Sequence, residues 1–216
     1  MRRSIIDLEE NLNFNRERWG SYDQWVQKDQ FGYKWGGGVQ QTTGGRAKFA
    51  DEFFRPHTGG RYDHKILELA PGAGRFTAEC IRYASKIDLL DMNQACLDIC
   101  RERFRYYPLE IGYFLNDGIS CDILGDRTYT LIVCYDSMVH MHPRIIEGYV
   151  TQVSVRLSIE GIMWLDHSGK GPRELGHRTD MTTEKMARYG LSCGLRVVEQ
   201  RFRNDHDCIT VFRRVE

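Results

Sequence analysis

Residues 66–76 read Ile-Leu-Glu-Leu-Ala-Pro-Gly-Ala-Gly-Arg-Phe and constrain the fold of this chain more than any other segment. The apolar run at its start predicts a buried parallel strand that carries one carboxylate, Glu68. A turn with Gly72 and Gly74 follows, and the residues after it are compatible with a helix. Such a turn lets backbone N–H groups approach a ligand at the positive end of a helix dipole. Because Glu68 would repel a phosphate, the segment favours a cationic or amine-bearing ligand.

Strand and helix patterns alternate from residue 65 onward. Apolar runs predict strands at 66–70, 87–90, 111–115, 129–135 and 161–165. Helical patterns fall between them, at 75–84, from Asn93 towards Pro108, at 145–157 and at 182–193. The final strand-like runs, Val197–Phe202 and Cys208–Phe212, flank a polar turn and predict a hairpin. The order predicts an α/β fold, with a Rossmann-like, doubly wound, mostly parallel sheet that ends in an antiparallel hairpin.

The first 60 residues have a different composition. They contain three of the four tryptophans (Trp19, Trp25 and Trp35), together with two glycine runs. We expect residues 1–60 to form an aromatic-rich helical cap over the carboxyl edge of the sheet in residues 61–216. Packing of this segment against the sheet, without a role in binding, is the alternative.

Composition excludes several classes of function. Among the 216 residues, 30 are Lys or Arg and 30 are Asp or Glu, so no net charge favours nucleic acid or an anionic membrane. The N-terminus lacks the apolar segment of a signal peptide, and no apolar run reaches the ~20 residues of a membrane span. The seven cysteines form no C-x-x-C pair, which suits a reduced, cytoplasmic compartment. We expect no metal site, because no His or Cys cluster has ligand spacing.

The segment at 66–76 resembles motif I of the class I S-adenosylmethionine-dependent methyltransferases, which usually reads Glu/Asp-x-Gly-x-Gly-x-Gly. Here the motif reads Glu68-x-Ala70-x-Gly72-x-Gly74, with alanine in place of the first glycine. Alanine keeps the turn tight unless its φ must be positive. A nicotinamide-dinucleotide fingerprint is the rival, but it needs glycine or alanine where this chain has Thr77. The closing hairpin is also typical of class I methyltransferases.

The resemblance implies S-adenosyl-L-methionine as cofactor, bound where the parallel strands end. Asp91 follows the second strand and suits the two hydroxyls of a ribose, whereas Asp117 would accept from the adenine amino group. Met92 would pack on the adenine. The expected cofactor-binding residues are Trp35, Glu68, Ala70, Gly72, Gly74, Asp91, Met92, Asn116, Asp117, Gly118 and Tyr135.

Three further residues follow later strands and are candidates for catalysis. Transfer of a methyl group to a hydroxyl needs a general base, and histidine suits this role near neutral pH. His140 lies after the fourth predicted strand, and His167 lies after the fifth. Either can be the base, with Asp136 orienting the histidine or the acceptor.

Short motifs at 116–118, 136–140, 167–169 and 177–182 resemble a bacterial subgroup associated with glycan and small-molecule methylation. The leading hypothesis is therefore an O-methyltransferase that acts on a hydroxyl of a small molecule or saccharide. An N-methyltransferase that acts on a small-molecule amine is the alternative, because a neutral amine needs no strong base. A nicotinamide-dependent oxidoreductase and a catalytically silent binding protein are further alternatives. The Asn-Pro-Pro-Tyr type motif of nucleic-acid and protein methyltransferases is absent after the fourth strand.

Overall fold

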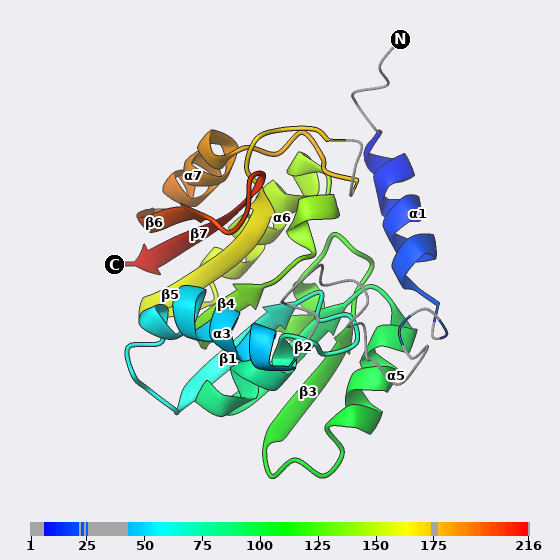
Figure 1. Ribbon diagram of the computed structural model, residues 1–216, viewed down its shortest axis with the longest axis vertical. Coiled ribbons are helices and arrows are strands. Elements are labelled where there is room, and N and C mark those ends of the chain that lie inside the picture. Colours follow the sequence, from blue (N-terminus) through cyan, green and yellow to red (C-terminus); the bar gives the residue numbers. More distant parts are fainter. Residues whose placement is uncertain (1–6, 22, 24, 26–42, 174–176, 216) are drawn as a thin grey trace.

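A seven-stranded sheet with helices on both faces organises the chain (Figure 1). The computed structural model describes residues 7–21, 23, 25, 43–173 and 177–215. The strands are β1 (His64–Leu69), β2 (Ala84–Asp91), β3 (Glu110–Leu115), β4 (Tyr129–Cys134), β5 (Leu157–Ser168), β6 (Leu195–Phe202) and β7 (Asp207–Arg214). The α-helices are α1 (Leu8–Trp19), α3 (Thr43–Phe53), α4 (Thr77–Cys80), α5 (Gln94–Arg103), α6 (Pro143–Ser154) and α7 (Thr183–Ser192). Short 3₁₀ helices are η4 (Arg55–His57), η5 (Ile81–Tyr83), η6 (Asp122–Leu124) and η7 (Met138–His140).

The strand order is β3-β2-β1-β4-β5-β7-β6. Strands β1 to β5 are parallel to one another, whereas β7 lies antiparallel between β5 and β6. The predicted doubly wound sheet with a final antiparallel hairpin is therefore confirmed. The order reverses between β1 and β4, and such a switch point opens a crevice at the carboxyl ends of the strands.

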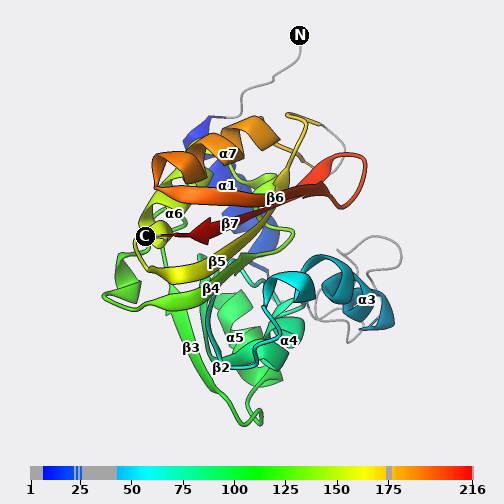
Figure 2. The ribbon, with the colours of Figure 1, turned by 90° about the vertical axis from the view of Figure 1, so that its left-hand side faces the viewer.

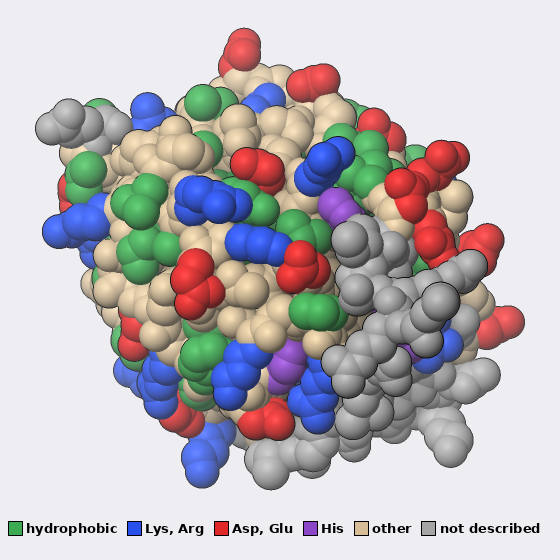
Figure 3. Space-filling view, turned by 90° about the horizontal axis from the view of Figure 1, so that it is seen from above, with side chains coloured by type: hydrophobic (Ala, Val, Ile, Leu, Met, Phe, Trp, Pro, Cys, Tyr) green, Lys and Arg blue, Asp and Glu red, His purple; other side chains and the backbone are tan. Residues whose placement is uncertain are grey.

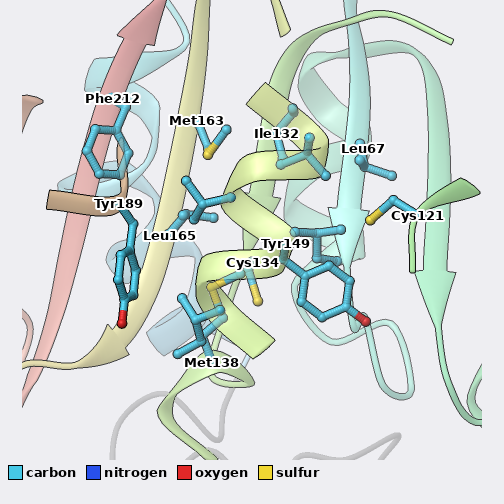
Figure 4. Packing of buried hydrophobic residues seen from close by; sticks show 14 of the residues in the cluster. Leu67, Cys121, Ile132, Cys134, Met138, Tyr149, Met163, Leu165, Tyr189 and Phe212 are labelled. Atoms are coloured by element: carbon cyan, nitrogen blue, oxygen red, sulfur yellow. The ribbon is translucent and has the colours of Figure 1, made fainter. Parts of the chain in front are cut away.

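Each face of the sheet is covered by its own set of helices (Figure 2). On one face, Ile132 and Met163 belong to the same buried cluster as Tyr149 of α6 and Tyr189 of α7 (Figure 4). The opposite face packs against α3, α4 and α5, with aromatic side chains at its centre. Trp164 of β5 is fully buried there, stacks on Phe76 with the ring centroids 5.3 Å apart, and donates to the Phe53 carbonyl at 2.8 Å.

Two local predictions differ from the structure. The helix predicted at 75–84 consists of the short α4 followed by η5. The strand predicted at 161–165 is longer, because β5 begins at Leu157 and continues to Ser168. Its extension pairs with β7, where Ser168 lies opposite Asp207. By contrast, Thr182 caps α7 as expected, since its hydroxyl accepts from the Lys185 N–H at 3.2 Å.

The surface carries charged side chains of both signs, in agreement with a formal net charge of zero. Lys and Arg side chains are interspersed with Asp and Glu side chains over most of the face shown in Figure 3, and acidic side chains gather along its right-hand edge. Among the described residues, every helix is too short or too polar to cross a bilayer.

Two helical glycines test the packing of the sheet against its helices. A Cβ at Gly190 in α7 would overlap the ring of Phe212, whereas a Cβ at Gly148 in α6 would meet only the end of Gln152, at 3.8 Å. We expect Gly190→Ala to lower the free energy of unfolding by about 1–3 kcal/mol through overpacking. Gly148→Ala should raise it by about 0.5–1 kcal/mol through helix propensity. Urea denaturation of both variants measures the difference, and equal effects would contradict this packing.

Candidate active site

A cleft opens where β1, β2 and β4 end and is closed on one side by α1. Leu12, Asn15 and Trp19 of α1 line it, as does Trp25. Of the residues predicted from the sequence, the cleft brings together Glu68, Ala70, Gly72, Asp91, Met92, Gly118, Tyr135, Asp136 and His140.

The turn after β1 has left-handed backbone at all three motif positions. The φ angles are 51° at Ala70, 56° at Gly72 and 72° at Gly74. A side chain at Gly72 would come within 2.9 Å of the Trp25 ring, and one at Gly74 within 2.6 Å of Phe104. Gly74 therefore serves the packing of α5 and does not line the cleft. Ala70 has a positive φ, which costs an L-residue about 1–2 kcal/mol, so the substitution of the first glycine is strained.

Asp91 connects the end of β2 to this turn. Its Oδ2 accepts from the Gly72 N–H at 3.2 Å, and its Oδ1 accepts from the Asn93 N–H at 2.9 Å. Burial raises the pKa of Asp91 to about 6, although the backbone donors at Asn93 and Gly72 oppose the rise. The carboxylate thus lies at the cleft wall in a position fixed by the backbone.

Glu68 is the most deeply buried acid of the cleft. Its side chain lies on β1 and the residue is 1% exposed. Its Oε2 has no hydrogen-bond partner among the described residues. Burial raises the pKa of Glu68 to about 7, although the Thr77 hydroxyl and the positive charge of Arg103 both act to lower it. A buried carboxylate oxygen without a donor is suited to a cationic donor from a ligand.

Besides Gly74, two expected cofactor residues, Asn116 and Asp117, do not line the cleft. The Asn116 amide donates to the Ser120 carbonyl at 2.9 Å and to the Tyr149 hydroxyl at 2.8 Å, and does not line the cleft. The Asp117 carboxylate is exposed and accepts from the N–H groups of Ile119 and Ser120 in a local turn. The structure therefore gives no support for Asp117 as the adenine acceptor. Trp35 lies outside the described residues.

His140 lies in η7, after β4, and faces the cleft. Its Nδ1 lies 3.3 Å from the His177 carbonyl oxygen. Since a carbonyl only accepts, Nδ1 carries the proton and Nε2 is the basic nitrogen. Burial lowers the pKa of His140 to about 4, although Asp136 opposes the shift. The imidazole is therefore neutral near pH 7.

His167 has a different position from the one expected. It is fully buried within β5, opposite Cys208 of β7, and does not line the cleft. Its Nε2 lies 2.7 Å from the Thr210 hydroxyl, and its Nδ1 lies 2.7 Å from the Ser168 carbonyl. The sequence-based placement beyond the end of the strand is wrong, because the strand continues to Ser168.

Asp136 belongs to a buried ion-pair network. Its carboxylate accepts from Arg75 at 2.7 Å and from Arg203 at 2.6 Å. Arg203 also pairs with Asp166 at 2.8 Å and with Asp207 at 3.0 Å. Burial alone would raise the pKa of Asp136, but the two guanidinium groups hold it below its ordinary value. Asp136 is therefore oriented by arginines and ionised near pH 7.

Helix α1 holds the segment that carries His140, a feature the sequence analysis missed. The Asn11 side chain donates to the His140 carbonyl at 2.9 Å and accepts from the His142 N–H at 2.8 Å. Asn15 donates to the same carbonyl at 3.2 Å. Both asparagines are buried. Their i, i+4 spacing, with Leu12 next to Asn11, puts them on one face of a helix and could have indicated from the sequence that this face is buried.

The chain is similar to known proteins in part of its sequence and in its fold. A family model described as a methyltransferase domain matches residues 66–161. The fold is similar to that of the N-methyltransferase NodS from Bradyrhizobium japonicum WM9, crystallised with S-adenosyl-L-homocysteine. The TM-score is 0.69 at 14% identity, over 92% of this chain and 98% of that chain.

Two other solved structures show the breadth of this fold. Magnesium protoporphyrin IX methyltransferase from Synechocystis PCC 6803, with bound S-adenosylmethionine, has a TM-score of 0.68 at 10% identity, covering 99% of this chain and all of that chain. The [4+2]-cyclase SpnF has a TM-score of 0.65 at 13% identity, with 78% and 80% of the chains covered. No protein of curated function matches the sequence. These identities show the fold alone.

The buried Glu68 carboxyl predicts a pH-dependent stability. Its pKa is raised from 4.5 to about 7, so the stabilising contribution is present below pH 4.5 and is lost as the pH rises through 7. We expect Glu68→Gln to be more stable than the parent protein at pH 8, by up to about 3 kcal/mol, with the difference vanishing near pH 4.5. Urea denaturation without added ligand measures this, and parallel pH curves would refute it.

Proposed function

We propose that this chain is a class I S-adenosylmethionine-dependent methyltransferase and that it transfers the methyl group to a hydroxyl of a small molecule or saccharide. The match to a methyltransferase domain and the similarity in fold to methyltransferases support the first part of the proposal. His140 is the general base in this proposal. The observation that carries it is the His177 carbonyl beside Nδ1, because it selects the tautomer in which Nε2 is basic.

The cleft fits S-adenosylmethionine, which supplies an electrophilic methyl group on a sulfonium. The orphaned Oε2 of Glu68 suits the ammonium of the methionine part, and the backbone from Ala70 to Gly72 suits its carboxylate. Asp91, fixed by two backbone donors, suits the ribose hydroxyls. Met92 and Gly118 form the apolar wall proposed for the adenine.

His140 and its neighbours act on the acceptor. The neutral imidazole accepts the hydroxyl proton while the acceptor oxygen is held for in-line attack. The Asp136 carboxylate near the ring favours the imidazolium that this proton transfer forms, as its effect on the pKa of His140 indicates. Asp136 is thus a stabilising and positioning group, held by Arg75 and Arg203. His167 has no part in the proposal.

The division into a cap of residues 1–60 and a domain of residues 61–216 remains part of the proposal. The described residues of the cap support it, because Leu12, Asn15, Trp19 and Trp25 line the cleft. In this arrangement the cap excludes water from the reacting groups.

Methylation of an amine is a second candidate. Trp19 and Trp25 lie together at the cleft, with ring centroids 5.8 Å apart, and Tyr135 forms another wall. Aromatic faces stabilise a cation, and a neutral amine attacks without a base. This reaction would therefore tolerate the loss of His140.

The cofactor assignment predicts the behaviour of two cleft carboxylates. We expect Glu68→Gln and Asp91→Asn each to weaken S-adenosylmethionine binding by about 10–100-fold, because each loses a charge-assisted hydrogen bond. Titration calorimetry with the intact protein measures this. Asp98→Asn, on the exposed face of α5, is the matched control and should bind normally. Unchanged affinity in both cleft variants would remove Glu68 and Asp91 from the site.

The role of His140 predicts a loss of turnover without a loss of cofactor. We expect His140→Gln to lower kcat for hydroxyl acceptors by about 10²–10⁴-fold and to leave cofactor affinity unchanged. The parent kcat, at saturating cofactor, should stay level between pH 8 and pH 6, because the pKa of His140 is about 4. Transfer of labelled methyl groups to hydroxylated sugars and phenols, and to matched amines, measures both.

A histidine outside the cleft provides the control for this experiment. His57 of η4 pairs with Glu199 of β6 and does not line the cleft, so His57→Gln should keep full activity. Full activity of His140→Gln on hydroxyl acceptors would contradict the proposal. Activity on amines that survives this substitution would favour N-methylation.

A further inference from the structure

Arg75 places a guanidinium group at the wall of the cleft, one residue after the glycine turn. The residue is 8% exposed, and its Nη2 donates to Oδ2 of Asp136 at 2.7 Å. Its Nη1 is buried and has no hydrogen-bond partner in the described part of the chain. A buried N–H group of a cation without an acceptor is costly unless a ligand provides one.

In the part of the chain that the structure describes, Arg75 has fewer carboxylate partners than the neighbouring Arg203. Arg203 contacts three carboxylates, those of Asp136, Asp166 and Asp207, and Arg178 also pairs with Asp207. Arg75 has a single ion pair among the described residues, and it shares that partner, Asp136, with Arg203. Within these residues, Arg75 therefore has no carboxylate partner that it does not share, whereas Arg203 has three carboxylate partners.

The orientation of Arg75 is fixed by an aromatic ring. Its guanidinium carbon lies 5.2 Å from the centroid of the Tyr135 ring, within the range of a cation–π contact. Tyr135 is in turn stacked on Phe76, with centroids 4.5 Å apart. Arg75, Tyr135 and His140 all line the same cleft. A planar donor held in this way suits the geometry of a carboxylate.

We propose that Arg75 binds an anionic oxygen of the methyl acceptor, so that the preferred acceptor is a hydroxylated carboxylate. This inference rests on the proposed function, because it assigns the hydroxyl to His140 and the carboxylate to Arg75. The carboxylates Glu68 and Asp91 repel an anion from the other part of the cleft, which fixes the direction in which such an acceptor binds.

Matched pairs of compounds test the proposal by binding to the protein saturated with S-adenosylhomocysteine. The pairs are hydroxybenzoates with the corresponding hydroxybenzamides, and uronic acids with the parent sugars. Calorimetry should show at least one carboxylate that binds about 10-fold or more tightly than its neutral partner. Arg75→Gln should reduce this preference to less than about 3-fold, and Arg75→Lys should keep part of it.

Two controls separate recognition from folding. Asp136 keeps its pair with Arg203 when Arg75 is replaced, and retained affinity for S-adenosylhomocysteine shows that the cleft is intact. Arg101→Gln, on the exposed face of α5, makes the same change in net charge and should retain the preference for the carboxylate. Equal or weaker binding of every carboxylate, or a preference that survives Arg75→Gln, would overturn the inference.

The products distinguish this inference from the proposed function. Label released from the product by mild alkali would identify a methyl ester and contradict a hydroxyl acceptor. In that case, a binding preference for carboxylates that is lost in Arg75→Gln would still support Arg75 as the anion-binding residue. A stable methyl ether on neutral and anionic acceptors alike, with equal binding of both, would support the proposed function and refute the role of Arg75.

Discussion

The burial of carboxylates where the parallel strands end is the constraint on which the rest of this structure depends. An ionised carboxylate in a dry interior costs several kcal/mol unless donors or cations surround it. Asp91 is stabilised by backbone N–H groups, and Asp136 and Asp166 are paired with Arg203. Glu68 keeps one oxygen without a partner. Among these carboxylates, Glu68 is thus the one that keeps an oxygen available for a cationic ligand.

The closing hairpin of β6 and β7 contributes to the stabilisation of these buried carboxylates. Arg203 follows β6 and Asp207 begins β7, so the antiparallel insertion of β7 beside β5 brings both to the edge that holds Asp136. In the parallel part of the sheet, successive strands would reach the same edge only through helical crossovers. The hairpin therefore connects the topology of the sheet to the charge balance beside the cleft. Removal of one member of such a network leaves a buried charge without a partner.

Local sequence patterns predicted the succession of strands and helices along the chain and the positions of Glu68 and Asp91 at or near strand ends, because both depend on apolar periodicity. They failed for His167, since the length of β5 is set by pairing with β7 and not by its own residues. They also missed Arg203, whose three carboxylate partners are 4 to 67 residues away in sequence. The positive φ of Ala70 could not be predicted from the sequence, because alanine, unlike glycine, gives no indication of a left-handed backbone.

The most direct test of this account is the number of protons released when S-adenosylmethionine binds. Titration calorimetry at pH 7, in two buffers of different ionisation enthalpy, measures this number for the parent protein and for Glu68→Gln. Because the pKa of Glu68 is about 7, an ammonium bound against it should release about half a proton more from the parent protein than from the variant. Equal proton release from the two proteins, or no binding by the parent protein, would contradict the account.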